Sequence, residues 1–355
     1  MREAVMVIRI FRGIKRRIWR AYAKVEERFR MWLFGTDEWY SFIQWSTICN
    51  EYKLLEFKKR NHNRVIVYMT EHTEFAGLAD RLRGFVSGYI LAQENGRSFH
   101  LYHDKGFNIE TYLEPNEVDW RISPADISRG LNRVAFLWFT THWPRLEKRN
   151  REYHGYGLFD LIPHLPEELQ GKYTYGGVFN KLFRPTPYLQ GLIGQAMRAS
   201  GIQEGNFIAF HLRFLNFFEP VEMNRTEADV TGTPEQQRQM IEAVHAAIDR
   251  IYRESRCDHV LLFSDSNRFL QAPHPAYIKV LPGTVGHIAR HDNTAATTDK
   301  AFVDLFVMSK AAQVYSITGP NIYGGAFSRT AAAIGGKELI SIPYQPTEQT
   351  PNSAH

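Results

Sequence analysis

The chain has 355 residues, 44% of them apolar, which suffices to bury the cores of two domains of ordinary size or of one large domain. The two cysteines, Cys49 and Cys257, are too few and too far apart for a disulfide framework, and no Cys/His spacing suits a zinc site. This use of cysteine favours a reducing compartment. The net charge of +5 is concentrated in residues 1–33, which carry +7, so the rest of the chain carries −2. This balance argues against a nucleic-acid partner, and no run of 18 apolar residues is present for a membrane span.

Residues 1–33 predict an amphipathic helix with a basic face. Apolar residues from Val7 to Trp32 recur at steps of three or four, with Lys and Arg between them. These charges occupy the place of the apolar core of a signal peptide, which argues against a secretory leader. Two interpretations stay open. The helix lies on an anionic membrane surface, or it packs its apolar stripe against this protein or a partner, and amphipathicity alone does not separate them.

Residues 64–102 predict a strand, a helix and a second strand, which together form a βαβ unit. Gly77 stands at the start of the helix, where free backbone N–H groups favour an anion. The first turns then carry Asp80, Arg81 and Arg83. These side chains can bind a ligand. Alternatively, Asp80 caps the helix and the arginines form surface pairs, which elementary physics favours.

The remaining elements follow from apolar periodicity and turn residues. They are a buried aromatic run at 134–143, helices at 178–183, 187–199 and 234–254, a helix from 298, and strands at 277–280 and 314–317. Residues 200–205 read as a linker between two halves of the chain.

The second half opens with the apolar run 207–210, followed at once by His211 and Arg213. Such a run is typical of a buried strand in a parallel sheet, and ligands bind outside the carboxyl ends of these strands. A guanidinium placed there can hold a phosphate with two hydrogen bonds, and an imidazole can stack or hydrogen-bond. The alternative is a surface ion pair beside a buried histidine.

Two later segments lead to the same edge of the sheet. The strand 258–264 delivers Asp265 and Ser266, and Asp265 can accept two N–H donors from a guanine, hold a sugar hydroxyl or cap the next helix. The glycine-rich turn 319–325 opens a helix with Ser328 in its first turn, a pattern typical of a phosphate cradle but also of a turn with a purely geometric role. It lacks the Gly-Lys-Ser/Thr ending of a P-loop.

No Asp-x-Asp pair occurs in the sequence, so a sugar transferase that chelates a metal–diphosphate complex through such a pair is disfavoured. Without a metal, the charge of a diphosphate must be met by arginine and by helix N-termini, and the chain supplies both.

Taken in order, these motifs resemble the fucosyltransferase superfamily, which includes α-1,2-, α-1,6- and protein O-fucosyltransferases. The matching segments are 77–84, 183–185, 211–213, 263–266 and 325–328 followed by 331–332. The resemblance implies an α/β protein of the GT-B fold, with two Rossmann-like domains facing across a cleft. The expected division is a basic helical extension (1–60), an N-terminal domain (61–200), a C-terminal domain that binds a nucleotide sugar (201–345) and a polar tail (346–355).

The resemblance also implies an inverting, metal-independent transferase without a cofactor, which moves fucose from GDP-fucose to a hydroxyl of a cell-surface glycan or glycolipid precursor. Arg213 would hold the β-phosphate, His211 would lie by the nucleotide, and Asp265 would read the guanine. The other nucleotide-binding residues implied are Ser266, Gly325, Phe327 and Ser328 in the C-terminal domain, and Gly77, Asp80, Arg81 and Arg83 in the facing domain.

The sequence departs from the family where Phe214, Leu215 and Asn216 replace a second arginine and the residues after it. The catalytic base also varies within the family, and Glu219 is the candidate here, although it could be a surface group. Another nucleotide-sugar donor and a GT-B-derived binding protein without turnover stay open. We expect a cytoplasmic protein, held at the inner membrane face if residues 1–33 bind an anionic membrane.

Overall fold

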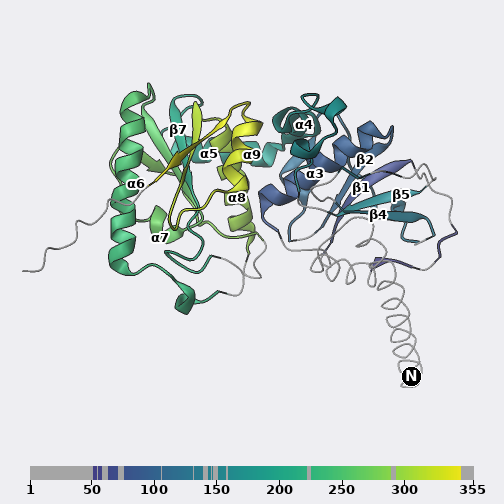
Figure 1. Ribbon diagram of the computed structural model, residues 1–355, viewed down its shortest axis with the longest axis horizontal. Helices are drawn as coiled ribbons and strands as arrows, with labels where there is room; N and C mark the ends of the chain where they lie inside the picture. The colour runs from purple at the N-terminus through teal and green to yellow at the C-terminus, as the bar shows by residue number, and fades with distance from the viewer. Residues whose placement is uncertain are drawn as a thin grey trace, which may run out of the picture.

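The computed structural model describes residues 51–53, 55–57, 63–70, 76–104, 106–130, 132–138, 143–144, 146, 151–156, 159–221, 225–288 and 293–344. The amphipathic helix predicted for residues 1–33 and the tail 346–355 lie outside these ranges. The described residues form two α/β domains that lie side by side (Figure 1). Within them, no helix has the length and apolar character needed to cross a membrane.

The N-terminal domain is built on a parallel sheet with the strand order β2-β1-β5-β4. Its strands are β1 (Arg64–Met69), β2 (Ser98–His103), β4 (Val134–Trp138) and β5 (Glu152–Tyr156). Every residue of β1 is buried, as expected of a central strand covered on both faces. Helix α3 (Leu78–Glu94) joins β1 to β2, so the predicted βαβ unit is confirmed.

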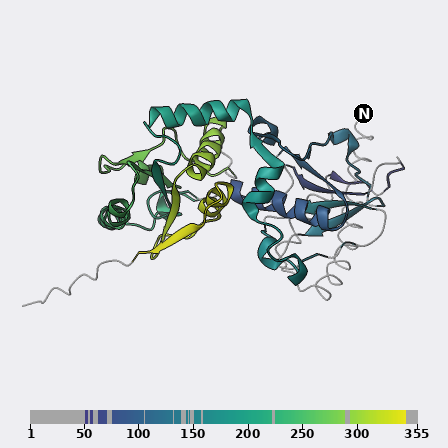
Figure 2. The same ribbon diagram turned by 90° about the horizontal axis from the view of Figure 1, so that it is seen from above.

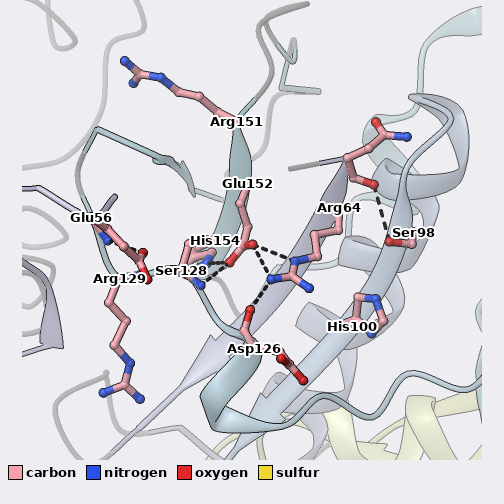
Figure 3. Close-up of polar contacts among 12 residues, drawn as sticks. Glu56, Arg64, Ser98, His100, Asp126, Ser128, Arg129, Arg151, Glu152 and His154 are labelled. Carbon is pink, nitrogen blue, oxygen red and sulfur yellow. Dashed lines mark hydrogen bonds and ion pairs between the residues drawn. The ribbon is translucent and has the colours of Figure 1, made fainter. Parts of the chain in front are cut away.

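A buried polar network covers the face of this sheet opposite α3 (Figure 3). Glu152 of β5 accepts hydrogen bonds from Arg64 Nε at 2.6 Å, from Ser128 N at 2.9 Å and from His154 Nε2 at 2.7 Å. Because His154 Nε2 donates to Glu152, its Nδ1 is left to accept from the Tyr52 hydroxyl. The network therefore ties residues 51–53 to the sheet.

The C-terminal domain contains a five-stranded parallel sheet with the order β11-β10-β7-β8-β9. The strands are β7 (Phe207–Leu212), β8 (His259–Ser264), β9 (Ile278–Val280), β10 (Gln313–Thr318) and β11 (Leu339–Pro343). The helices are α6 (Pro234–Glu254), α7 (Asn267–Leu270), α8 (Ala295–Ser309) and α9 (Ala326–Ile334). Counted from β7, the strand order is 3-2-1-4-5, so the direction of winding reverses between β7 and β10. Ligands of doubly wound folds bind at this switch point.

Helices α4 (Tyr175–Leu182) and α5 (Pro187–Ala199) connect the two domains, and α5 follows a two-stranded antiparallel ribbon of β3 (Leu113–Pro115) and β6 (Phe183–Pro185). Short 3-10 helices complete the described elements: Ile109–Thr111, Pro124–Asp126, Ile162–His164, Glu167–Leu169 and Glu227–Asp229.

The domains meet where α3 and α4 pack against α9 and where α5 packs against α8 (Figures 1 and 2). A Cβ on Gly176 of α4 would lie 1.8 Å from the carbonyl oxygen of Ala333 in α9, so the close approach of these helices requires glycine. The ring of Tyr112 stacks on Phe302 of α8 at 4.2 Å, and its hydroxyl donates to Asp299 at 2.8 Å. One apolar core runs through both domains. The expected GT-B arrangement of two Rossmann-like domains is confirmed for the described residues.

Candidate functional site

A pocket of about 190 Å³ lies between the two domains. The N-terminus of α3 forms one wall, and the ends of β7 and β8, the loop 285–288, α8 and the N-terminus of α9 form the other. It therefore lies at the carboxyl end of β7, beside the switch point. Among its lining residues are seven of those predicted from the sequence: Gly77, Asp80, His211, Arg213, Asp265, Gly325 and Phe327.

The end of β7 lies against the start of α9. A Cβ on Gly325 would lie 3.6 Å from His211 Cε1 and 3.7 Å from Arg213 Cδ, and the His211 ring centroid lies 5.6 Å from that of Phe327. The backbone also joins the two segments, because Tyr323 N donates to the Arg213 carbonyl at 2.8 Å. An arginine and a helix N-terminus are thus brought to one side of the pocket.

His211 is neutral in this environment. Burial, together with the charge of Arg213, lowers the pKa of His211 to about 4. Its Nδ1 is buried and has no hydrogen-bond partner among the described residues. A neutral imidazole beside a cation can accept or donate one hydrogen bond to a ligand without adding charge.

The N-terminus of α9 opens onto the pocket through Gly325, Ala326 and Phe327. Gly325 is the N-cap and has no side chain to occupy the first N–H groups, which leaves these donors for an anion. Ser328 does not line the pocket. It is fully buried, and its hydroxyl has no hydrogen-bond partner among the described residues.

Asp265 lines the pocket, and both of its oxygens accept hydrogen bonds from the backbone. Its Oδ1 accepts from Phe214 N at 2.8 Å and its Oδ2 from Leu215 N at 3.0 Å. Burial raises the pKa of Asp265 to about 6, and these two N–H donors oppose that effect. Leu215 has a φ of 53°, so the carboxylate holds an otherwise strained turn directly after Arg213. Ser266, not Asp265, caps α7, with its hydroxyl accepting from Phe269 N at 3.1 Å.

Glu219, the expected base, lies apart from the pocket lining. Glu219 is not among the pocket residues, and its Oε1 accepts from Arg268 N at 3.1 Å at the start of α7. A base must reach the proton that it removes, and Glu219 instead holds a loop to a helix.

Of the charged residues in the first turns of α3, Asp80 alone lines the pocket. Arg83 forms an ion pair with Asp80 Oδ1, as the favoured alternative expected of it, but Asp80 does not cap α3, whose N-cap is Gly77 without a side-chain cap. Arg81 is 1% exposed, donates from Nε to the Ala76 carbonyl at 3.1 Å and from Nη1 to His103 Nε2 at 3.0 Å, and its pKa is lowered by burial to about 10. Arg81 and Arg83 therefore position the rim of the pocket instead of lining it.

Sequence reasoning missed a buried ion pair in the pocket wall. Lys300 Nζ donates to Asp304 Oδ1 at 2.5 Å, one turn apart on α8, and the two residues are 6% and 5% exposed. Burial raises the pKa of Asp304, although the charge of Lys300 opposes the shift. The available signal was a Lys and an Asp four positions apart within an otherwise apolar helix, which places both on one face.

The loop 285–288 forms the remaining part of the wall. Asn267 of α7 fixes it, because its Nδ2 donates to the Val285 carbonyl at 3.0 Å and its Oδ1 accepts from Val285 N at 2.8 Å. His287 of this loop lines the pocket. Within the described part of the chain, no cluster of three or more His, Cys, Asp or Glu is placed to hold a metal ion.

Comparison with solved structures finds fucosyltransferases. The chain is similar to NodZ α-1,6-fucosyltransferase co-crystallised with GDP (TM-score 0.49, 14% identity, 78% of this chain and 93% of that one). It is also similar to a variant of Arabidopsis thaliana FUT1 in complex with GDP (0.47, 13%, 94% and 80%) and to POFUT1 in complex with GDP (0.43, 14%, 81% and 99%). No family model matches the chain, and no curated protein matches its sequence. At these identities and TM-scores the similarity assigns neither activity nor donor to this chain.

Proposed function

We propose that the protein is an inverting, metal-independent glycosyltransferase that uses a GDP-linked sugar, with GDP-fucose as the first donor to test and a glycan or glycolipid hydroxyl as the acceptor. The observation that carries this proposal is the meeting of Arg213 with the open N-terminus of α9 at the switch point of the C-terminal sheet. A guanidinium and a set of backbone N–H groups on one wall are complementary to a diphosphate. The order of the sequence motifs supports the fucosyltransferase class.

In the proposed reaction, an acceptor hydroxyl attacks C1 of the donor sugar from the face opposite GDP. The bond between C1 and the β-phosphate oxygen breaks, and its electron pair passes to that oxygen. Negative charge grows on GDP as this occurs, so Arg213 and the N–H groups of α9 stabilise the transition state more than the ground state. Neutral His211 adds a hydrogen bond without competing for the phosphates.

The buried pair on α8 suits the recognition of guanine. Lys300 Nζ carries three N–H donors, one of which donates to Asp304 Oδ1. Asp304 Oδ2 accepts no hydrogen bond from the described residues. The pair thus presents a donor beside an acceptor. Guanine is complementary, with O6 facing Lys300 and the N1–H and N2–H groups facing Asp304, whereas adenine presents the reverse pattern. This role replaces the one expected for Asp265.

Calorimetric titration with GDP, IDP, ADP and UDP, each with and without EDTA, tests the proposal. GDP should bind best and be insensitive to EDTA. IDP, which lacks the 2-amino group, should bind about tenfold more weakly, and ADP more weakly still. Preference for ADP or UDP would overturn the donor assignment, and binding of none would overturn the transferase.

The variant Asp304→Asn tests the recognition of the base. It should weaken GDP binding by about 10- to 100-fold, the range for one lost base contact, and shrink the difference between GDP and IDP. Asp299→Asn is the matched control. Asp299 is on the same helix but outside the pocket, where its two oxygens accept from Tyr112 and Tyr188. The amide of Asn keeps an oxygen for one hydroxyl and can donate an N–H to the oxygen of the other.

A further inference from the structure

Among the described residues, the wall of the pocket opposite the nucleotide side has one acid–base group. In an inverting displacement the acceptor approaches C1 from the side away from the leaving GDP. The groups proposed to hold GDP belong to the C-terminal domain, so the acceptor hydroxyl comes from the side of the N-terminal domain. That domain lines the pocket with residues 77–80, and Asp80 is the one titratable residue among them.

The carboxylate of Asp80 is held in place through one oxygen, and the side chain is accessible from the pocket. Arg83 pairs with Oδ1, whereas Oδ2 accepts no hydrogen bond from the described residues. The side chain is 36% exposed, so a hydroxyl can reach it. A Cβ on Gly77 would lie 3.5 Å from Asp80 Oδ2 and 3.8 Å from His287 Nε2 of the other domain. The free oxygen therefore lies close to the line where the two domains meet.

Three other carboxylates at or near the pocket, within the described part of the chain, already have other partners or lie outside the lining. Asp265 holds two backbone N–H groups, Asp304 is buried with Lys300 on the nucleotide side, and Glu219 lies outside the lining. Among the described residues that line the pocket, His287 is the neighbouring group that could compete for the role, and it belongs to the domain proposed to hold GDP.

We propose that Asp80 is the general base of the transfer, an inference that rests on the proposed function. Oδ2 takes the proton of the acceptor hydroxyl as the oxygen bonds to C1, while the bond from C1 to the β-phosphate oxygen breaks and its electron pair leaves with GDP. Arg83 is a positioning residue that holds Oδ1, so that Oδ2 faces the incoming hydroxyl.

Turnover of GDP-fucose, followed by GDP release with water as the acceptor, tests the assignment alongside calorimetric GDP binding. In Asp80→Asn and Asp80→Ala, GDP affinity should stay within about twofold of wild type while turnover falls by about 100-fold or more, the usual contribution of a general base. Sodium azide needs no deprotonation, so it should restore turnover of Asp80→Ala and give a glycosyl azide of inverted configuration. Glu219→Gln is the matched carboxylate-to-amide control and should behave as wild type.

The possible outcomes distinguish an error in the assignment of Asp80 from an error in the proposed transferase function. Undiminished hydrolysis by Asp80→Asn would overturn the base assignment, as would loss in Asp80→Ala that azide does not relieve. Loss confined to His287→Gln would transfer the role to His287. Failure of the wild-type protein to bind GDP, or to turn over the donor with either water or azide, would overturn the proposed transferase itself.

Discussion

Replacement of Arg213 tests the arrangement on which the proposed chemistry depends. The side chain leaves the end of β7, passes beside Gly325 and lines the pocket at the N-terminus of α9. Arg213→Ala should remove about 2–4 kcal/mol of transition-state stabilisation, the cost of losing one preorganised charge-stabilising group. This corresponds to a loss of about 30- to 1,000-fold in the rate of donor turnover. Arg213→Lys keeps the charge but loses the planar pair of N–H donors, so its rate of donor turnover should lie between those of wild type and Arg213→Ala.

The same variant has a second, independent readout. Part of the lowering of the His211 pKa comes from the charge of Arg213, after the larger effect of burial. Removing that charge should raise the His211 pKa, which an NMR titration of the imidazole measures. A thermal melt close to that of wild type would show that folding is intact. Turnover within threefold of wild type in a folded Arg213→Ala protein would refute the reasoning.

Two further predictions concern stability. Burial lowers the pKa of His154, although its hydrogen bond to Glu152 opposes the shift. As the pH falls below about 6.5, His154 therefore becomes protonated in the unfolded chain before it does so in the folded chain. The free energy of unfolding should thus fall as the pH falls, by up to about 1.4 kcal/mol per pH unit, and urea unfolding at several pH values should show a flatter dependence for His154→Gln. Gly176→Ala should cost about 1–3 kcal/mol by overpacking α4 against α9, whereas Gly191→Ala on α5, whose Cβ would meet nothing within 4 Å, should not lower the melting temperature. Equal melting temperatures for the two alanine variants would contradict the close contact.

The elements that sequence reasoning located well carry local signals. Helices α5 and α6 begin at Pro187 and Pro234, as predicted, because each proline follows a threonine whose hydroxyl caps the helix. Strand β5 was missed for the opposite reason. It contains Glu152 and His154, whose partners Arg64 and Tyr52 are distant in sequence, so the local pattern reads as polar although both side chains are fully buried. Edge strand β11 was also missed; it has five residues, ends in a proline and is largely exposed although Leu339, Ile340 and Ile342 are apolar.

For the candidate site, the sequence predicts which residues lie together but not which hydrogen bonds their side chains form. Parallel strands and their helices fix which segments reach the carboxyl edge of the sheet, so His211, Arg213 and Gly325 could be placed together from order and topology alone. Which groups a side chain has already bonded depends on tertiary contacts. The backbone N–H groups that donate to Asp265 belong to residues 214 and 215. No sequence motif predicts the turn that these two residues form.

Three aspartates share one pocket, and their surroundings give them three different tasks. Asp265 is buried against the backbone, where its two N–H bonds make it a clamp for the turn after Arg213. Asp304 is buried beside Lys300, so the two present a donor and an acceptor with little net charge, as the recognition of a neutral base requires. Asp80 is more than one-third exposed and held through one oxygen, which leaves the other for a proton. In the proposed assignment, environment and not residue type separates the three roles of clamp, guanine reader and general base. The variants Asp265→Asn, Asp304→Asn and Asp80→Asn should then fail in three distinct measurements: melting temperature, nucleotide selectivity and turnover.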